Sequence, residues 1–277
     1  MTGATNILKL VKLGDNKWNV GNYQYADMIS RLSDSDIEIV KALDNIGDGE
    51  LSAIGIIIQH QDLVRNYHPR ELAKDFYESV IYGFCMINYE EMRHGFILKE
   101  LASTAKEKES FVESVKSDLL HELMFETKEL YKNPYESLMS YLLGEITNVE
   151  LYASIEKQVE NDELRQIIKN IRKDEQKHKG AWLNIIKRMV KKNSVHRQNF
   201  INATKAIHFI HQAEISRYFV SGAQSVERFF TPGVSKFIID EKHRILEDIF
   251  GESPLDKIRL FTEFNEYFQE NVLAKAI

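Results

Sequence analysis

The chain has 277 residues, of which 43% are hydrophobic and 28% are charged, a balance typical of soluble globular proteins. Its net charge of −6 argues against a nucleic-acid-binding protein, because such proteins gain affinity by neutralising phosphates. The one cysteine, Cys85, excludes an internal disulfide framework and a cysteine-built zinc or iron site, and we expect it to be an inert buried thiol. The sequence has neither a secretory signal nor an apolar run of about 20 residues, so we predict a soluble cytoplasmic protein that binds no membrane.

The low content of proline, 4 residues, and glycine, 13 residues, favours long helices over a turn-rich β protein. The first ~33 residues lack clear periodicity and no strand pattern is convincing. Ser/Asp starts, glycine stops and prolines predict helices over 33–47, 50–66, 69–103, 109–131, 135–160 and 163–191, with further helices beyond Asn193. We therefore expect one all-α domain over 1–277, with a core bundle at about 45–191 and extra helices at about 194–277.

Two predicted buried helix faces are each interrupted by a glutamate and a histidine three residues apart. Glu91 and His94 interrupt an apolar stripe within 73–101, and Glu175 and His178 interrupt a second stripe within 164–189. An ionised carboxylate in a core costs several kcal/mol unless it finds a counter-charge. A shared pair of metal ions would satisfy both interruptions, so we expect these side chains to be metal ligands.

A complete di-metal set needs one more carboxylate from each of two neighbouring helices. Glu145 is the one acid in the apolar stripe of 138–152 and lies at nearly the same height as Glu175, whereas Glu150 has wetter neighbours. Glu50 is the natural donor from the first helix, although the helix lengths leave it roughly 8 Å out of register with Glu91. His60 fits this register less well.

A single Glu-x-x-His is weak evidence, because about one match is expected by chance in a chain with 9 histidines. Two matches on apolar stripes, each with a neighbouring carboxylate helix, favour a metal site over surface pairs. A second cluster, His208, His211 and Glu214, has no partner helix with matching acids and is expected to be solvated. The basic stretch of 187–192 is most simply a solvated face.

The paired motifs resemble those of the ferritin-like di-iron carboxylate proteins, and within them the soluble acyl-carrier-protein desaturases. "EEMRHG" at 90–95 is similar to the E-E-x-R-H-G ligand motif, and "DEQKH" at 174–178 is similar to D-E-x-x-H. The resemblance covers roughly 45–190 and implies a ferritin-like four-helix bundle. It also implies that Asp174 supports a ligand histidine. The family's threonine for oxygen activation is replaced here by Asn148, which we take as a candidate residue beside the metals.

The resemblance implies two iron ions, with manganese as the alternative metal. In that arrangement Glu91 and Glu175 would bridge the ions, and the remaining ligands are Glu50, His94, Glu145 and His178. The implied activity is O2-dependent oxidation of an acyl or similar apolar chain, with desaturation as the leading reaction. The implied partners are O2, an external electron donor such as ferredoxin, acyl carrier protein docked on the basic stretch of 187–192, and a second copy in a homodimer.

Two other functions stay open at this point. One is a di-iron hydroxylase or N-oxygenase of a small-molecule pathway, and the other is a ferroxidase or iron-handling protein. Leu98 stands where radical-type ribonucleotide reductase subunits usually have a tyrosine, and Ile171 stands where arylamine N-oxygenases add a histidine. Rubrerythrins need cysteines that this chain lacks. These differences argue against the three relatives.

Overall fold

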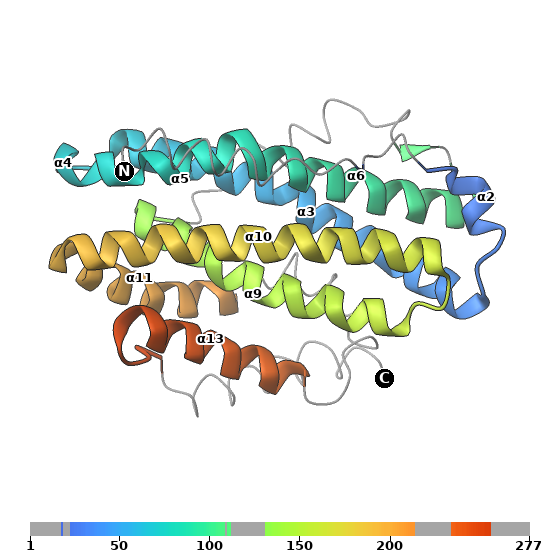
Figure 1. Cartoon of the computed structure of the whole chain (residues 1–277). Helices are drawn as coiled ribbons and strands as arrows, with labels where there is room; N and C mark the ends of the chain where they lie inside the picture. Colours follow the sequence, from blue (N-terminus) through green and yellow to red (C-terminus); the bar gives the residue numbers. More distant parts are fainter. Residues whose placement is uncertain (1–17, 19–22, 109, 112–130, 214–233, 256–277) are drawn as a thin grey trace.

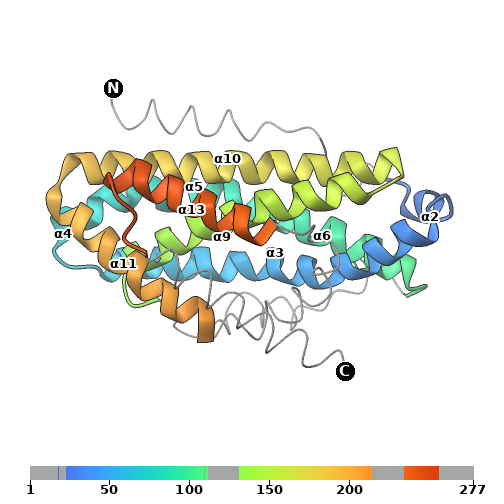
Figure 2. The same ribbon diagram turned by 90° about the horizontal axis from the view of Figure 1, so that it is seen from below.

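The computed structural model describes residues 18, 23–108, 110–111, 131–213 and 234–255. These residues form helices and their connections, with no strand among them, which confirms the predicted all-α fold. Figures 1 and 2 show an elongated bundle in which α3 packs along α6, and α9 packs along α10. The four long helices of this bundle are α3 (Asp34–Asn66), α6 (Asn88–Ala105), α9 (Pro134–Gln158) and α10 (Asp162–Lys192).

Polar side chains cap the starts of three core helices. The Ser33 hydroxyl accepts a hydrogen bond from the backbone of α3, and Asn133 and Asn161 do the same for α9 and α10. Pro134 occupies the first turn of α9, where its missing N–H costs nothing. These caps confirm the predicted breaks before α9 and between α9 and α10.

The predicted division of 33–66 into two helices is wrong, because α3 runs unbroken from Asp34 to Asn66. Gly47, the last residue of the predicted helix over 33–47, lies inside α3 at its contact with α6. A Cβ on Gly47 would lie 3.3 Å from the backbone oxygen of Gly95, and a Cβ on Gly95 would lie 3.1 Å from that of Gly47. The two glycines therefore serve the close approach of α3 and α6, not a helix end.

The predicted helix over 69–103 follows a less regular path than its stripe suggested. Four short segments precede α6, namely α4 (Arg70–Ala73), the 3₁₀ turn η2 (Lys74–Phe76), α5 (Tyr77–Tyr82) and the π-helical segment η3 (Gly83–Ile87). The apolar stripe within 73–101 includes Tyr77 and leaves out Phe76 and Tyr82. In the structure Phe76 and Tyr82 are buried, whereas Tyr77 is 52% exposed. The 3₁₀ turn and the wider π turn shift which side chains face inward. Cys85 lies in η3 and is exposed, so the prediction of a buried thiol is wrong.

The remaining described helices cover the ends and one side of the bundle. α2 (Tyr25–Ile29) packs against α6, while α11 (Ser194–Ala213) and α13 (Val234–Phe250) pack against α9 and α10 (Figure 1). Most of the predicted helix over 109–131 and the side chains of His208, His211 and Glu214 lie outside the described residues. Among the described helices, none is both long enough and apolar enough to cross a membrane.

Two apolar clusters fill the bundle on either side of its middle. One cluster includes Ile57, Leu142 and Ile185, and the other includes Leu43 and Leu98. In α10 the residues of the two clusters are separated by the polar stretch 172–180, and in α3 Glu50 lies between Ile46 of one cluster and Ile57 of the other. The bundle therefore holds a polar zone at mid-height between two dry ends.

Candidate metal centre

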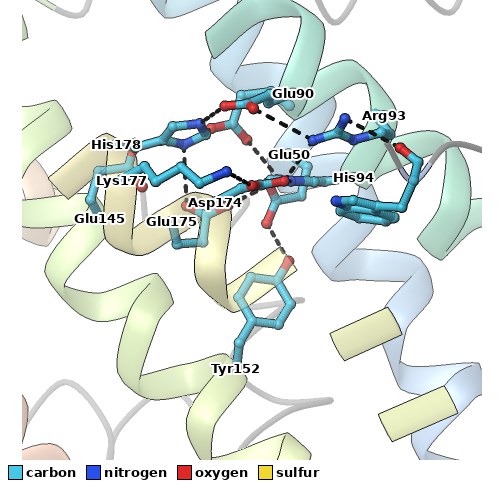
Figure 3. Close-up of polar contacts among 12 residues, drawn as sticks. Glu50, Glu90, Arg93, His94, Glu145, Tyr152, Asp174, Glu175, Lys177 and His178 are labelled. Atoms are coloured by element: carbon cyan, nitrogen blue, oxygen red, sulfur yellow. Dashed lines mark hydrogen bonds and ion pairs between the residues drawn. The ribbon is translucent and has the colours of Figure 1, made fainter. Parts of the chain in front are cut away.

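Six ionisable side chains from all four core helices meet in this polar zone (Figure 3). Each is at most 5% exposed. Helix α3 contributes one carboxylate, α6 contributes a carboxylate and an imidazole, α9 contributes one carboxylate, and α10 contributes a carboxylate and an imidazole. The six residues are Glu50, Glu91, His94, Glu145, Glu175 and His178.

The donor atoms form two overlapping sets that could each hold a metal ion. The first set joins Glu50 and His94 to Glu91 and Glu175, and we call it half-site A. The second joins Glu145 and His178 to the same two glutamates, and we call it half-site B. Within each set the donor atoms lie within 4.8 Å of one another. Because Glu91 and Glu175 belong to both sets, the two half-sites have these two ligand residues in common.

The shared glutamates divide their oxygens between the two histidines. Glu175 places Oε1 3.0 Å from Nδ1 of His94 and Oε2 3.7 Å from Nδ1 of His178. Glu91 does the reverse, with Oε1 3.2 Å from Nδ1 of His178 and Oε2 3.9 Å from Nδ1 of His94. A carboxylate that offers one oxygen to each half-site is placed to bridge two ions.

Each imidazole is oriented by a carboxylate outside the six. His178 donates from Nε2 to Glu90 Oε2 at 2.7 Å, and Nε2 of His94 lies 3.4 Å from Asp174 Oδ2. Because a carboxylate accepts hydrogen bonds, these contacts favour a proton on Nε2 of each ring, and Nδ1 of each ring faces the cluster. Metal-bound histidines commonly make this kind of contact.

The two orienting carboxylates are themselves held by cations. Arg93 donates to Asp174 at 2.6 Å and lies 3.6 Å from Glu90, so one guanidinium links both carboxylates. Lys177 also donates to Asp174, at 2.6 Å. Burial alone would raise the pKa of Asp174, but the hydrogen bonds from His94 and Lys177 outweigh it and lower this pKa below its ordinary value. Asp174 is therefore ionised and fixed at neutral pH.

Two aromatic residues complete the surroundings of half-site A. Trp18 stacks on the His94 ring with centroids 5.9 Å apart, and the Arg93 guanidinium lies 4.5 Å above the indole. Tyr152, on α9, is fully buried and donates its hydroxyl hydrogen bond to Oε1 of Glu50 (Figure 3). Half-site A is thus supported by groups from outside the ligand set.

The carboxylates of the cluster cannot all be ionised without a counter-charge. Burial, together with the charges of Glu175 and Glu50, raises the pKa of Glu91 well above its ordinary value, and burial with Glu175 does the same for Glu145. Against burial, neighbouring carboxylates raise the pKa of both His94 and His178 well above the ordinary value. The cluster therefore has a strong demand for protons or other cations.

Several buried atoms of the cluster that could bind a metal ion make no hydrogen bond within the described structure. They are both oxygens of Glu175, Oε2 of Glu145 and Nδ1 of His178. Buried polar atoms are normally satisfied, so such a group points to a missing partner. Four carboxylates and two imidazoles suit iron or manganese, which accept mixed oxygen and nitrogen ligands. The residues present therefore fit a pair of metal ions.

All six predicted ligand residues are brought together, including Glu50, despite the register mismatch expected from helix lengths. Glu150 is half-buried and interacts with surface charges such as Lys179, and His60 is held by Ser137 and Ser79 instead. Asp174 supports a histidine as predicted, namely His94.

Asn148, by contrast, is half-buried and belongs to neither half-site. Glu90, Arg93, Tyr152 and Trp18 were not predicted. Glu90 and Arg93 stand inside the "EEMRHG" motif, which was the available signal, whereas Trp18 lies in a segment without periodicity.

Comparisons with known proteins place the fold. No protein-family model matches the chain, and no curated protein matches it. The structure is similar to that of an R2-like ligand-binding oxidase with an aerobically reconstituted Mn/Fe cofactor, with 14% sequence identity and a TM-score of 0.51. The match covers 96% of this chain and 90% of that chain. A single-substitution variant of the same oxidase matches with the same TM-score, 0.51, over 95% of this chain. The chain therefore has the helical fold of these oxidases.

Proposed function

We propose that the six clustered residues hold two metal ions and that the chain is an O2-dependent oxidoreductase. The single observation that carries this proposal is the pair of half-sites that share Glu91 and Glu175. The R2-like oxidase with the same fold carries a Mn/Fe cofactor, which supports iron and manganese as the metals here. When bound, such a metal pair supplies the activation of O2 and accepts electrons from a substrate.

The protein's own residues would position the ions and exclude water. Glu91 and Glu175 would bridge the ions, while Glu50 and His94 hold one and Glu145 and His178 hold the other. Glu90 and Asp174 keep the ring proton of each histidine on Nε2, so that Nδ1 stays available as a ligand. The apolar clusters above and below keep bulk water away and strengthen these electrostatic contacts.

Desaturation of an acyl chain is the leading reaction, because the two paired motifs resemble those of acyl-carrier-protein desaturases. The basic stretch of 187–192 offers less support for a carrier than the sequence suggested. Lys187 pairs with Asp248, Arg188 with Glu78, and Lys192 with Asp75. Much of its positive charge is thus neutralised within the chain. Hydroxylation or N-oxygenation of a small molecule is the alternative reaction.

The metal centre is tested by loading the purified chain without oxygen. We expect two equivalents of Fe(II), or one each of Mn(II) and Fe(II), to remain after gel filtration. Glu145→Gln should lose at least one of them, because it removes a terminal ligand. Glu150→Gln is the matched control on the same helix and should retain both. Fewer than two ions in the unaltered chain would refute the proposal.

The reaction class is tested on the loaded protein with O2 and a ferredoxin reducing system. Acyl carriers of several chain lengths, arylamines and Fe(II) alone are offered in parallel, and products are identified by mass spectrometry. New double bonds support desaturation, whereas an added oxygen atom supports the hydroxylase or N-oxygenase alternative. Oxidation of excess Fe(II) alone, together with a large cage-like oligomer, would favour an iron-handling protein and refute an oxidoreductase of organic substrates.

A further inference from the structure

Glu50 differs from the other three carboxylates of the cluster in one contact. Its Oε1 accepts a hydrogen bond from the Tyr152 hydroxyl. Within the described structure, Glu91, Glu145 and Glu175 accept no hydrogen bond from a side chain outside the six, and Glu145 Oε2 is buried without any hydrogen bond. Of the two terminal carboxylates, Glu50 is therefore held by a hydrogen bond from outside the cluster and Glu145 is not.

The brace comes from the helix that also supplies the opposite terminal ligand. Tyr152 follows Glu145 on α9 by two helical turns, about 10 Å along the axis, so both side chains point into the bundle. The Tyr152 ring is fully buried within the apolar cluster that includes Leu98 and Ile171. A ring fixed in this way can adopt few other positions, so its hydroxyl is a rigid donor.

The two carboxylate oxygens of Glu50 have different partners. While Oε1 accepts from Tyr152, Oε2 faces the cluster, 3.4 Å from Nδ1 of His94. We infer that Tyr152 is a positioning residue that holds Oε1 of Glu50 and so directs Oε2 to the ion of half-site A. This inference rests on the proposed metal centre. It makes half-site A the preorganised one, because the corresponding carboxylate of half-site B, Glu145, lacks such a brace.

The experiment is a titration of the purified chain with Co(II) under nitrogen, followed by visible absorption and calorimetry. Tyr152→Phe removes the hydroxyl and keeps the ring. We expect it to weaken one of the two binding steps by about 10–100-fold and leave the other unchanged, the size usual for a lost partner of a metal ligand. Tyr141→Phe is the matched control, because Tyr141 is also buried on α9 and donates to α3, but to the backbone oxygen of Ala53 at 2.7 Å.

A double-mutant cycle separates positioning from a general structural effect. In a Glu50→Gln background, Tyr152→Phe should weaken binding by no more than about 2-fold, because the carboxylate that it positions is already gone. An undiminished effect in that background, or equal Co(II) affinities for Tyr152→Phe and Tyr141→Phe, would overturn the inference and leave the metal centre standing. Failure of the unaltered chain to bind two ions would overturn the proposed function and this inference together.

Discussion

Alanine at Gly95 tests the close approach of α3 and α6. A Cβ built there would lie 2.5 Å from Cγ of Leu51, 2.7 Å from its Cδ2 and 3.1 Å from the backbone oxygen of Gly47. The leucine side chain can rotate, but the Gly47 carbonyl belongs to α3 and moves only with the helix. Relief of the clash therefore requires α3 and α6 to separate.

The expected cost of Gly95→Ala follows from two opposing terms. Overpacking a well-filled contact costs about 1–3 kcal/mol. Replacing a mid-helix glycine by alanine stabilises the folded state by about 0.5–1 kcal/mol, because alanine loses less conformational entropy than glycine when the chain folds. We expect a net loss of up to about 2.5 kcal/mol in the free energy of unfolding. At Gly49, on the same helix as Gly47, nothing lies within 4 Å of an added Cβ, so Gly49→Ala should be stabilising by about 0.5–1 kcal/mol.

Both variants are measured by urea denaturation followed by circular dichroism, in the metal-free state. The opposite signs are the decisive result. Gly95 is next to His94 and Leu51 is next to Glu50, so separation of the helices should also weaken metal binding at half-site A. A Gly95→Ala protein as stable as Gly49→Ala, with unchanged Co(II) affinity, would show that α3 and α6 do not approach as closely as the structure places them.

Two further predictions concern groups away from the metal centre. Burial lowers the pKa of His60 to about 3, so the folded state resists a proton that the unfolded state accepts as pH falls below about 6.5. On this account the free energy of unfolding should fall as pH drops below about 6.5, with a slope that approaches about 1.4 kcal/mol per pH unit. Denaturation of His60→Gln at pH 7, 6 and 5 should show a shallower fall than the unaltered chain, with the larger difference between pH 6 and 5. Asp36 accepts hydrogen bonds from the backbone N–H groups of Glu160 and Asn161, at 2.9 and 2.8 Å, so Asp36→Ala should cost about 1–3 kcal/mol by the same measurement. A loss under 0.5 kcal/mol would mean that water replaces this buried cap.

Five of the six clustered residues could be predicted because the sequence places polar residues where a core helix needs apolar ones. Glu91 and Glu175 interrupt otherwise apolar faces, and a buried carboxylate without a partner is too costly to occur by chance twice. The periodicity of a helix is a local property, so one sequence suffices to reveal it. Glu50 was chosen instead as the carboxylate that a complete set needs from the first helix, and its height relative to the other ligands depends on the path of the chain through η2 and η3.

The features that were missed depend on contacts between helices. Gly47 has the local pattern of a helix stop, and only its contact with Gly95 shows why glycine is needed within α3. Tyr152 fits an apolar stripe as well as it fits a hydrogen-bond donor, so periodicity alone could not separate the two roles. Cys85 was missed for another reason: it lies in the π-helical segment η3, whose wider turn changes which side chains face inward.

The charges around the cluster also explain why a metal pair suits it better than protons. The groups that orient the histidines form a neutral set, in which Arg93 and Lys177 offset Glu90 and Asp174. This set has no positive charge left for the four inner glutamates. Their four negative charges, when all are ionised, equal the positive charge of two divalent ions.

Protons could neutralise the same carboxylates, but a protonated carboxyl group also becomes a donor that must find an acceptor. Divalent ions instead accept lone pairs from oxygens and imidazole nitrogens alike. They would therefore satisfy the buried atoms of Glu145, Glu175 and His178 that have no hydrogen bond. Bound ions should stabilise the folded chain in proportion to the logarithm of their concentration, because the unfolded chain cannot assemble ligands from four helices.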